Sequence, residues 1–254
     1  MSEDRGLDIS RDFFSAKRIE NVLLLRFQNN MVLRATDLQA KDTLLNYLDR
    51  VSKNDSVKVV VFVSSPDKTG SQEYIEFFRH LLKSSRDLQA IHRMCNVIDQ
   101  LILEIVGLNK IIVHATSGRV ISMFLNVSLA CDYRIVADNT VFQNPYLELG
   151  VVPKGGGPFF LSKKFGRSKA YEILLFRKEI TAHEALKLGI VDRVVPFDNL
   201  ESETLKIAHR FSERPSSTLS GTKRLLNYPV NDLKEYLEFE NQELFKIIEP
   251  AFWK

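Results

Sequence analysis

Cysteine is scarce in this chain, and its scarcity excludes a disulfide-stapled scaffold. The 254 residues include two cysteines, Cys95 and Cys131, too few for a disulfide framework or a Cys-x-x-Cys metal site. Both lie on apolar segments with helical spacing, so we expect two buried thiols in a reducing compartment. No pair of histidines has metal-ligand spacing with a third ligand at hand, so we expect no metal ion.

The chain also lacks a long hydrophobic run. Residues 1–20 are charged throughout and contain no apolar core of a secretory signal. No later run approaches the ~18 apolar residues that a membrane-spanning helix needs. We therefore expect a soluble, cytoplasmic protein without a membrane partner.

Neither sign of charge dominates. The chain has 35 Lys and Arg against 32 Asp and Glu, a net charge of +3, and no block of like charges. This balance gives no support to nucleic-acid binding, although a basic pocket for one phosphorylated ligand is compatible with it. The 44% apolar fraction is enough for a substantial core. We expect a core over residues 1–196 and a helical region over residues 197–254.

The stretch from Lys110 to Gly166 has the pattern of a βαβ unit. A β-branched strand at 111–113 is followed by a turn at 117–118, an apolar helix at 123–130 and a strand at 133–136. A glycine turn, Gly155-Gly156-Gly157-Pro158, then opens another helix. This order brings backbone N–H groups together at one place.

The flanking segments add strands and helices to this unit. After a polar lead, the pattern predicts strands over 22–27, 57–63 and 191–195, and helices over 37–51, 72–82, 88–108, 169–176 and 181–188. Residues 64–71 read as a loop. Thr181 and Glu184 have the spacing of a capping box, and Gly189 is placed to end that helix. From Leu200 onward we expect only helices, broken at Pro215 and Pro229.

The turns of the central region follow a known pattern without gaps from Ser117 to Pro196. Its matched positions are Ala130-Cys131-Asp132, Leu149-Gly150, Pro153, Gly156-Gly157, Gly166, Ala185, Gly189 and Val191. In these motifs the chain resembles the crotonase superfamily, the enoyl-CoA hydratase/isomerase group. The resemblance implies an α/β fold, a spiral of ββα turns with a C-terminal helical region that forms trimers, and trimers of this group often pair into hexamers. It also implies a coenzyme A thioester as ligand and no prosthetic group.

The resemblance further implies that two backbone N–H groups form an oxyanion hole for a thioester enolate. By alignment these belong to Met123 and to Gln72 or Ser71. The chain departs from the pattern at both places, since Ser122-Met123-Phe124 replaces the usual three glycines and residues 70–73 read Gly-Ser-Gln-Glu. The N–H groups survive such replacements, but the space that glycine leaves for a ligand does not.

The two positions that hold glutamates in hydratases are Asn126 and Tyr146 in this sequence. Hydration of a double bond needs a general base and a general acid, and carboxylates suit both roles. Asn does not exchange a proton near neutral pH, and Tyr does so only if its pKa falls well below ~10. We therefore do not expect ordinary hydratase activity.

Several other residues are candidates, each with a structural alternative. Lys154 aligns with an acidic catalytic position of related isomerases, so it is either an acid or base or a solvated loop residue. Tyr146 either donates to the ligand or fills the acyl pocket, and Asn126 either binds a ligand or satisfies nearby backbone. Glu73 and Glu148 are expected as surface charges. His114 is expected as a core residue, because no orienting partner for it can be identified.

Arg34 stands where the family usually has Asn, and it either contacts the phosphates of coenzyme A or is a solvated surface residue. Two functions remain open. The first is an acyl-CoA enzyme with altered chemistry, such as isomerisation, decarboxylation or thioester cleavage. The second is a catalytically silent member that keeps the scaffold for binding or structure.

Overall fold

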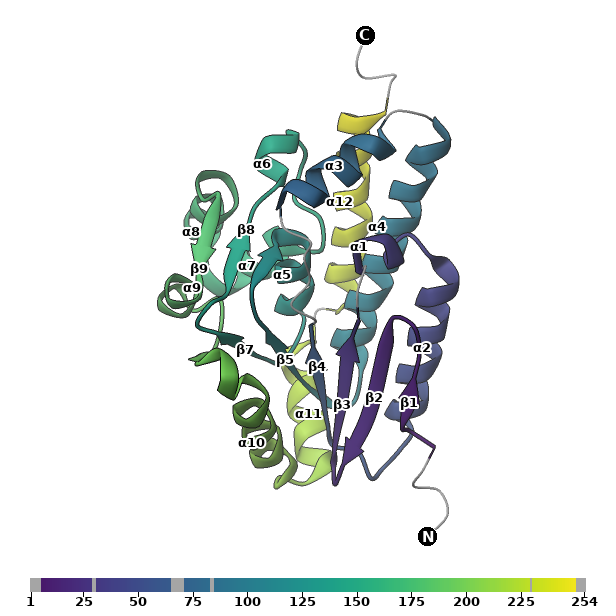
Figure 1. Cartoon of the computed structure of the whole chain (residues 1–254), viewed down its shortest axis with the longest axis vertical. Coiled ribbons are helices and arrows are strands. Elements are labelled where there is room, and N and C mark those ends of the chain that lie inside the picture. Colours follow the sequence, from purple (N-terminus) through teal and green to yellow (C-terminus); the bar gives the residue numbers. More distant parts are fainter. Residues whose placement is uncertain (1–5, 29–30, 65–70, 83–84, 229, 250–254) are drawn as a thin grey trace.

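The computed structural model describes residues 6–28, 31–64, 71–82, 85–228 and 230–249. These residues form two β-sheets with helices packed around them (Figure 1). The large sheet has the order β1-β2-β3-β4-β5-β7-β10 and the small sheet the order β6-β8-β9. The expected loop at 64–71 and the turn at 28–30 lie largely outside the described residues.

The strands of the large sheet are β1 (Ile9–Ser10), β2 (Phe14–Ile19), β3 (Val22–Phe27), β4 (Val59–Val63), β5 (Ile111–Thr116), β7 (Tyr133–Ala137) and β10 (Arg193–Val195). The pairs β1–β2 and β2–β3 are antiparallel, and every later pair is parallel. Because parallel strands end at one edge, the residues that follow β4 and β5 come together there, at the edge where ligands usually bind.

The small sheet consists of β6 (Arg119–Ile121), β8 (Val141–Gln143) and β9 (Glu179–Thr181). β5 in the large sheet is followed by β6 in the small sheet and then by helix α5 (Ser122–Leu129). β7, β8 and α6 (Tyr146–Leu149) repeat this order. The chain therefore advances as ββα turns, as the resemblance implied.

The remaining helices are α1 (Met31–Arg34), α2 (Leu38–Ser52), α3 (Ser71–Leu81), α4 (Ser85–Gly107), α7 (Gly157–Phe165), α8 (Arg167–Tyr171), α9 (Ala182–Leu188), α10 (Leu200–Ser212), α11 (Ser216–Leu226) and α12 (Val230–Ile248). A π-helical turn, η1, covers Glu172–Phe176, and a 3-10 turn, η2, covers Phe197–Asn199. Within the described part of the chain, no helix is both long and apolar enough to cross a membrane.

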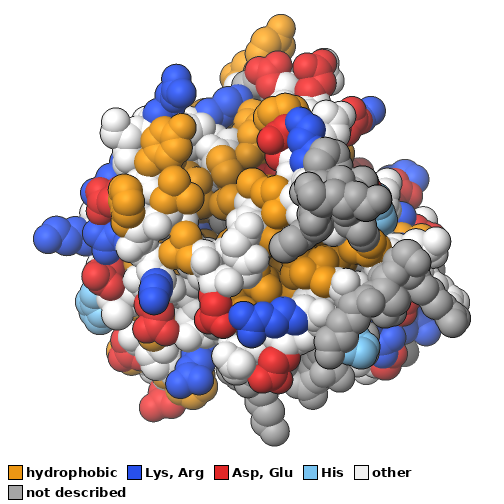
Figure 2. Space-filling model, turned by 90° about the horizontal axis from the view of Figure 1, so that it is seen from above, with side chains coloured by type: hydrophobic (Ala, Val, Ile, Leu, Met, Phe, Trp, Pro, Cys, Tyr) orange, Lys and Arg blue, Asp and Glu red, His pale blue; other side chains and the backbone are white. Residues whose placement is uncertain are grey.

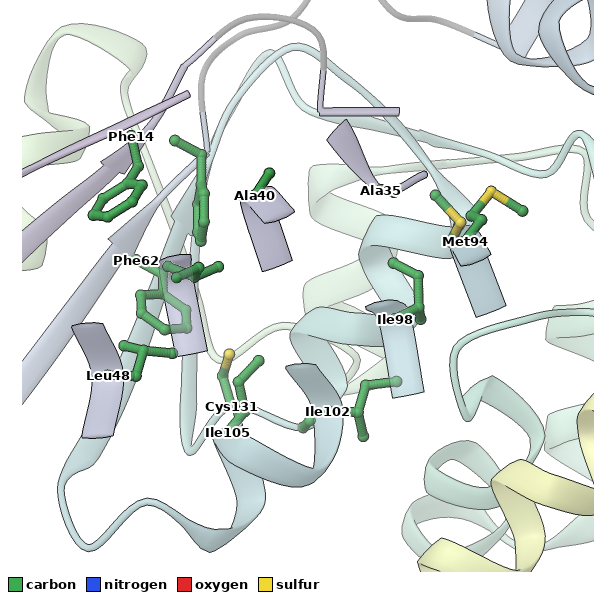
Figure 3. Close-up of a cluster of buried hydrophobic side chains, with 14 of the residues drawn as sticks. Phe14, Ala35, Ala40, Leu48, Phe62, Met94, Ile98, Ile102, Ile105 and Cys131 are labelled. Carbon is green, nitrogen blue, oxygen red and sulfur yellow. The ribbon is translucent and has the colours of Figure 1, made fainter. Parts of the chain in front are cut away.

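The large sheet is covered on both faces. Val59 and Val61 of β4 pack in a cluster with residues of α10 and α11. Val60 and Phe62 point to the opposite face, into the larger cluster with α2 and α4. Figure 3 shows Phe62 in that cluster beside side chains of these two helices. Burial on both faces explains why β4 reads as an unbroken apolar run.

Most predicted elements are confirmed, and the errors are the N-terminal segment and the three short strands β6, β8 and β9, which the sequence pattern did not predict. The capping box of α9 is present, and Gly189 ends that helix with a φ of 76°. The prediction of a polar lead before Val22 is wrong, because β1 and β2 form an antiparallel pair at the edge of the large sheet. Phe14 and Ala16 of β2 face inward while Lys17 is exposed, an alternation too short to stand out in the sequence.

Candidate functional site

The N-terminus of α5 lies at the carboxyl edge of the large sheet, directly after β6. Ile121 is its N-cap residue and provides no side-chain cap. The first N–H groups of a helix have no partner inside the helix, so the N–H of Met123 is oriented for an acceptor beyond the helix end. The Met123 side chain is fully buried, and its Sδ lies 3.9 Å from the Tyr74 hydroxyl.

Gln72 lies in the first turn of α3, where backbone N–H groups are likewise free of intrahelical partners. Its side chain is exposed and donates from Nε2 to Glu76 Oε1 at 3.0 Å. Tyr74, two residues further along α3, reaches Met123 on α5. The two candidate donor segments are therefore neighbours, while the side chain of Ser71 lies outside the described residues.

Asn126 and Tyr146 meet at one main-chain oxygen. Asn126 Nδ2 donates to the Lys154 carbonyl at 2.9 Å, and the Tyr146 hydroxyl donates to the same oxygen at 3.2 Å. Both side chains are buried. Burial, with Tyr74 and Glu240 nearby, raises the pKa of Tyr146 well above its usual value, so the phenol remains a neutral donor.

The space around Asn126 is filled by the glycine turn. A Cβ added to Gly157 would lie 2.5 Å from Asn126 Oδ1, and one added to Gly155 would lie 3.2 Å from Asn126 Cβ. Gly155 and Gly156 also have positive φ values of 97° and 73°. Glycine is needed here because the backbone turns left-handed and passes against the Asn126 amide.

Lys154 is fully buried and ion-paired. The alternative expectation of a solvated loop lysine is therefore wrong. Its Nζ contacts Asp99 Oδ1 and lies 3.1 Å from Glu240 Oε1. Burial lowers the pKa of Lys154, but the Glu240 and Asp99 carboxylates more than offset this, so its pKa is raised and the ammonium stays charged.

Glu240 joins helix α12 to the glycine turn. Its carboxylate accepts from the N–H of Gly155 at 2.7 Å and from the N–H of Gly156 at 3.0 Å. Asn241 Nδ2 also donates to Asp99 Oδ2 at 2.7 Å. Helix α12 therefore fixes the position of the glycine turn. The carbonyl of Lys154, at the start of this turn, accepts the hydrogen bonds from Asn126 and Tyr146.

An apolar pocket of about 110 Å³ lies on the other side of α5. Phe124, Val127 and Ser128 line it from α5, whereas Met123 and Asn126 do not. Figure 3 shows other residues of its lining, Ala40 of α2, Phe62 of β4 and Cys131. An engineered apolar cavity of about 150 Å³ holds benzene, so this pocket has room for a small organic group.

Three polar side chains line the pocket at the ends of β4 and β5. Ser64 Oγ and His114 Nε2 form a hydrogen bond of 2.9 Å, and Thr116 lies on the same strand face as His114. Burial, and then Arg134, lowers the pKa of His114 to about 4, so the ring is neutral near pH 7. His114 is buried as expected, but Ser64 is the partner that sequence reasoning missed.

Arg34 also lines the pocket, together with Lys41 and Arg119. The Arg34 guanidinium contacts Asp12 and lies 3.4 Å from Asp37 Oδ2, with its side chain 34% exposed. It is thus a partly buried, paired cation rather than a freely solvated one. Among the other candidates, Glu148 is exposed and pairs with Arg79, and the side chain of Glu73 lies outside the described residues.

Comparison with known proteins points to one family. The chain matches the family described as enoyl-CoA hydratase/isomerase over residues 17–251. The Dictyostelium discoideum protein named "Probable enoyl-CoA hydratase, mitochondrial" is 31% identical over 140 residues, which are 55% of this chain. The match spans 50% of that relative, so this chain aligns with about half the length of the curated protein.

Solved structures agree on the fold. An enoyl-CoA hydratase from Bacillus halodurans superimposes with a TM-score of 0.81 at 21% identity, covering 94% of this chain and 96% of that one. An enoyl-CoA hydratase from Mycobacterium avium subsp. paratuberculosis gives a TM-score of 0.76 at 19% identity, covering 96% and 94%. The α/β crotonase-like fold and its C-terminal helical region are thereby confirmed.

Proposed function

The chain belongs to the enoyl-CoA hydratase/isomerase family, and we propose that it binds an acyl thioester of coenzyme A without hydrating it. The backbone N–H groups of Met123 and Gln72 receive the thioester oxygen in this proposal, with the N–H of Ser71 as the alternative register. Arg34, at the pocket, contacts the phosphates of coenzyme A.

The observation that carries the proposal is the shared acceptor of Asn126 and Tyr146. Both donate to the Lys154 carbonyl, so neither is free to activate water. The carboxylates of Asp99 and Glu240 are bound to the Lys154 ammonium. A hydration site needs an acid and a base within reach of the reacting carbons, and here these positions hold the fold together.

The oxyanion hole is supported by the position of two helix N-termini. The first turns of α3 and α5 are linked through the Tyr74–Met123 contact, and each offers N–H groups without an intrahelical partner. Removal of one such donor in other enzymes costs roughly 3 to 4 kcal/mol of transition-state stabilisation. A thioester enolate held in this way serves isomerisation, decarboxylation or thioester cleavage, the reaction classes open to this chain.

We assign Lys154 a positioning role. Its ammonium is held by Glu240 and Asp99, and its carbonyl holds Asn126 and Tyr146. A lysine whose pKa is raised by two carboxylates is a poor base near pH 7. It fixes the turn against α5, while proton transfer falls to another group or to the ligand itself.

A catalytically silent scaffold is the second candidate function. The observation that favours it is the complete burial of Met123 where the family usually has glycine, which narrows the approach to the α5 N-terminus. A silent member keeps the scaffold as a binding or structural subunit, and in this candidate function no acyl-CoA binds. The two candidates therefore differ in a direct binding measurement.

We also propose that copies of the chain associate as a homotrimer or a hexamer of two trimers. Leu225 and Leu226 at the end of α11 and Tyr228 just after it are 78 to 88% exposed, and Phe176 of η1 is 79% exposed. Hydrophobic side chains also gather on another face, the one at the top of Figure 1, which Figure 2 shows from above. Exposed apolar surface of this kind is usually covered by a partner. Sedimentation analysis tests the assembly, with a monomer at all concentrations contradicting it.

Two further expectations stay proposals. The division into a core over residues 1–196 and a helical region over residues 197–254 is testable by limited proteolysis, which should cut near residue 197. The cytoplasmic location is testable by microscopy of a tagged chain in its cell of origin.

The decisive experiment for the function compares two variants at one position. Gln72→Pro removes the proposed N–H donor, and proline is tolerated in the first turn of a helix, whereas Gln72→Ala keeps the N–H. We expect calorimetry to show acyl-CoA binding by the wild type and by Gln72→Ala, and weaker binding by Gln72→Pro. Absence of acyl-CoA binding by the wild type would instead support the silent scaffold.

A further inference from the structure

One side of α5 is closely packed, and the other side faces a pocket. Asn126, on one side, is enclosed by Gly155, Gly157 and the Lys154 carbonyl. Phe124 and Val127, on the other side, line the pocket of about 110 Å³. Among the residues that the structure describes, an acyl group that approaches the N-terminus of α5 therefore finds room on the side of Phe124 and Val127.

Thr116 is a buried hydroxyl that lacks a partner in this pocket. The residue is 1% exposed, and its Oγ1 makes no hydrogen bond within the described part of the chain. A buried hydroxyl without a partner is unfavourable, whereas an oxygen on a ligand in the pocket would satisfy it. Thr116 lines the pocket, so a ligand oxygen in the pocket would lie next to this residue.

The neighbours of Thr116 indicate that the ligand oxygen is neutral. Val63 pairs with Ala115 in the sheet, so Ser64 lies beside Thr116, and Ser64 Oγ bonds to the His114 ring at 2.9 Å. The ring is neutral because its pKa is lowered to about 4, chiefly by burial. Neutral hydroxyls and a neutral imidazole match a hydroxyl or carbonyl oxygen, not a buried carboxylate.

The cations on the pocket lining fit the rest of the same ligand. Arg34 lines the pocket, and so does Arg119, which is exposed and forms no ion pair with the residues that the structure describes. Guanidinium groups are good partners for phosphate. Apolar walls, a few polar groups and cationic side chains together suit an acyl chain attached to a phosphorylated carrier.

We propose that the acyl group of the thioester lies in this pocket, on the Phe124 and Val127 side of α5, and that Thr116 selects acyl chains carrying a hydroxyl or oxo oxygen. This inference rests on the proposed binding of acyl-CoA and names the acyl class and the specificity residue. It places the acyl group away from Asn126 and Tyr146.

The test is a calorimetric titration with coenzyme A, butanoyl-CoA and the 2-, 3- and 4-hydroxy derivatives of butanoyl-CoA. Thr116→Val replaces the hydroxyl with a methyl of similar volume. Thr204→Val is the matched control, because Thr204 is equally buried on α10 and bonds to the Leu200 carbonyl, outside the pocket lining. Val127→Phe is a second variant that fills the pocket from α5.

We expect one hydroxy derivative to bind the wild type about five- to tenfold more tightly than butanoyl-CoA, the gain typical of one hydrogen bond. Thr116→Val should abolish this preference without weakening butanoyl-CoA, and Thr204→Val should keep it. Val127→Phe should remove the contribution of the acyl chain and leave coenzyme A binding unchanged.

Equal affinities in the wild type, or a preference that survives in Thr116→Val, would overturn this inference while leaving acyl-CoA binding in place. Tighter butanoyl-CoA binding than coenzyme A binding in Val127→Phe would also overturn it. If no acyl-CoA binds the wild type, the proposed function fails and the inference falls with it.

Discussion

Asn126 and Tyr146 donate hydrogen bonds to one acceptor, the main-chain oxygen of Lys154, at 2.9 and 3.2 Å. They occupy the positions at which the resemblance implies two hydratase glutamates. A pair of donors to one carbonyl is a structural arrangement, since it uses the Tyr146 hydroxyl and an N–H of the Asn126 amide on the backbone.

Loss of the Tyr146 hydroxyl should destabilise the fold modestly. In Tyr146→Phe the carbonyl keeps its bond from Asn126, so we expect a loss of about 1 kcal/mol in the free energy of unfolding. Asn126→Ala should cost about 1 to 3 kcal/mol, because it also removes packed amide volume. Urea unfolding measures both. Tyr171→Phe, at a 54% exposed position, is the control and should lie within about 0.5 kcal/mol of the wild type.

Removal of the Lys154 charge should strongly reduce the free energy of unfolding. Lys154→Met leaves Asp99 and Glu240 buried without their cation, a change that typically costs about 3 to 5 kcal/mol. Lys53→Met is the matched control, since Lys53 pairs with Asp49 at 2.6 Å with its side chain 72% exposed, and exposed pairs contribute less than about 1 kcal/mol. Equal losses in the two variants would contradict a structural role for Lys154.

A methyl group at Gly157 should collide with Asn126. The added Cβ would lie 2.5 Å from Asn126 Oδ1, so we expect Gly157→Ala to lose about 1 to 3 kcal/mol by overpacking. Gly107→Ala, where a Cβ meets nothing within 4 Å, is the control. Part of the loss should disappear in the Asn126→Ala background, which a double-mutant cycle detects. Strictly additive losses would show that the contact does not carry the effect.

Titration of His114 should make the free energy of unfolding depend on pH in the acid range. Its pKa falls from 6.5 to about 4 on folding, so the unfolded chain binds more protons between these values and stability falls as pH decreases through this window. The full loss corresponds to about 3 kcal/mol. Asp99 and Glu240 have raised pKa values and act in the opposite direction, so the comparison needs a variant that lacks only the histidine titration.

His114→Gln provides that variant. The free energy of unfolding of the wild type minus that of His114→Gln should decrease as pH decreases from 6.5 to about 4. Below that pH the difference should stay constant. A difference that stays constant across this range would contradict the neutral, buried imidazole.

The sequence predicts local features of this fold well and long-range contacts poorly. Thr181 and Glu184 form their capping box because the two residues are three apart and need no other partner. The strands β6, β8 and β9 were missed because three residues carry no periodicity. The glycine turn was expected from Gly155 to Gly157, and its left-handed residues are present.

The candidate site shows the same division. Its residues could be placed by alignment, but the acceptor that joins Asn126 to Tyr146 is a backbone atom, which no side-chain pattern reveals. Glu240 reaches Lys154 across 86 residues, and Ser64 meets His114 across 50. The pairing of β4 with β5 brings the second contact about, so the strand register was the missing information.

The most direct test of the account is a carbon NMR spectrum of a 2-enoyl-CoA labelled with ¹³C at the thioester carbonyl, recorded with the protein in excess. Two converging N–H donors polarise the carbonyl, so we predict a downfield shift of its resonance and an intact double bond over hours. An unshifted resonance, or conversion to the hydroxyacyl product by the wild type, would contradict the claim that this chain holds a thioester without hydrating it.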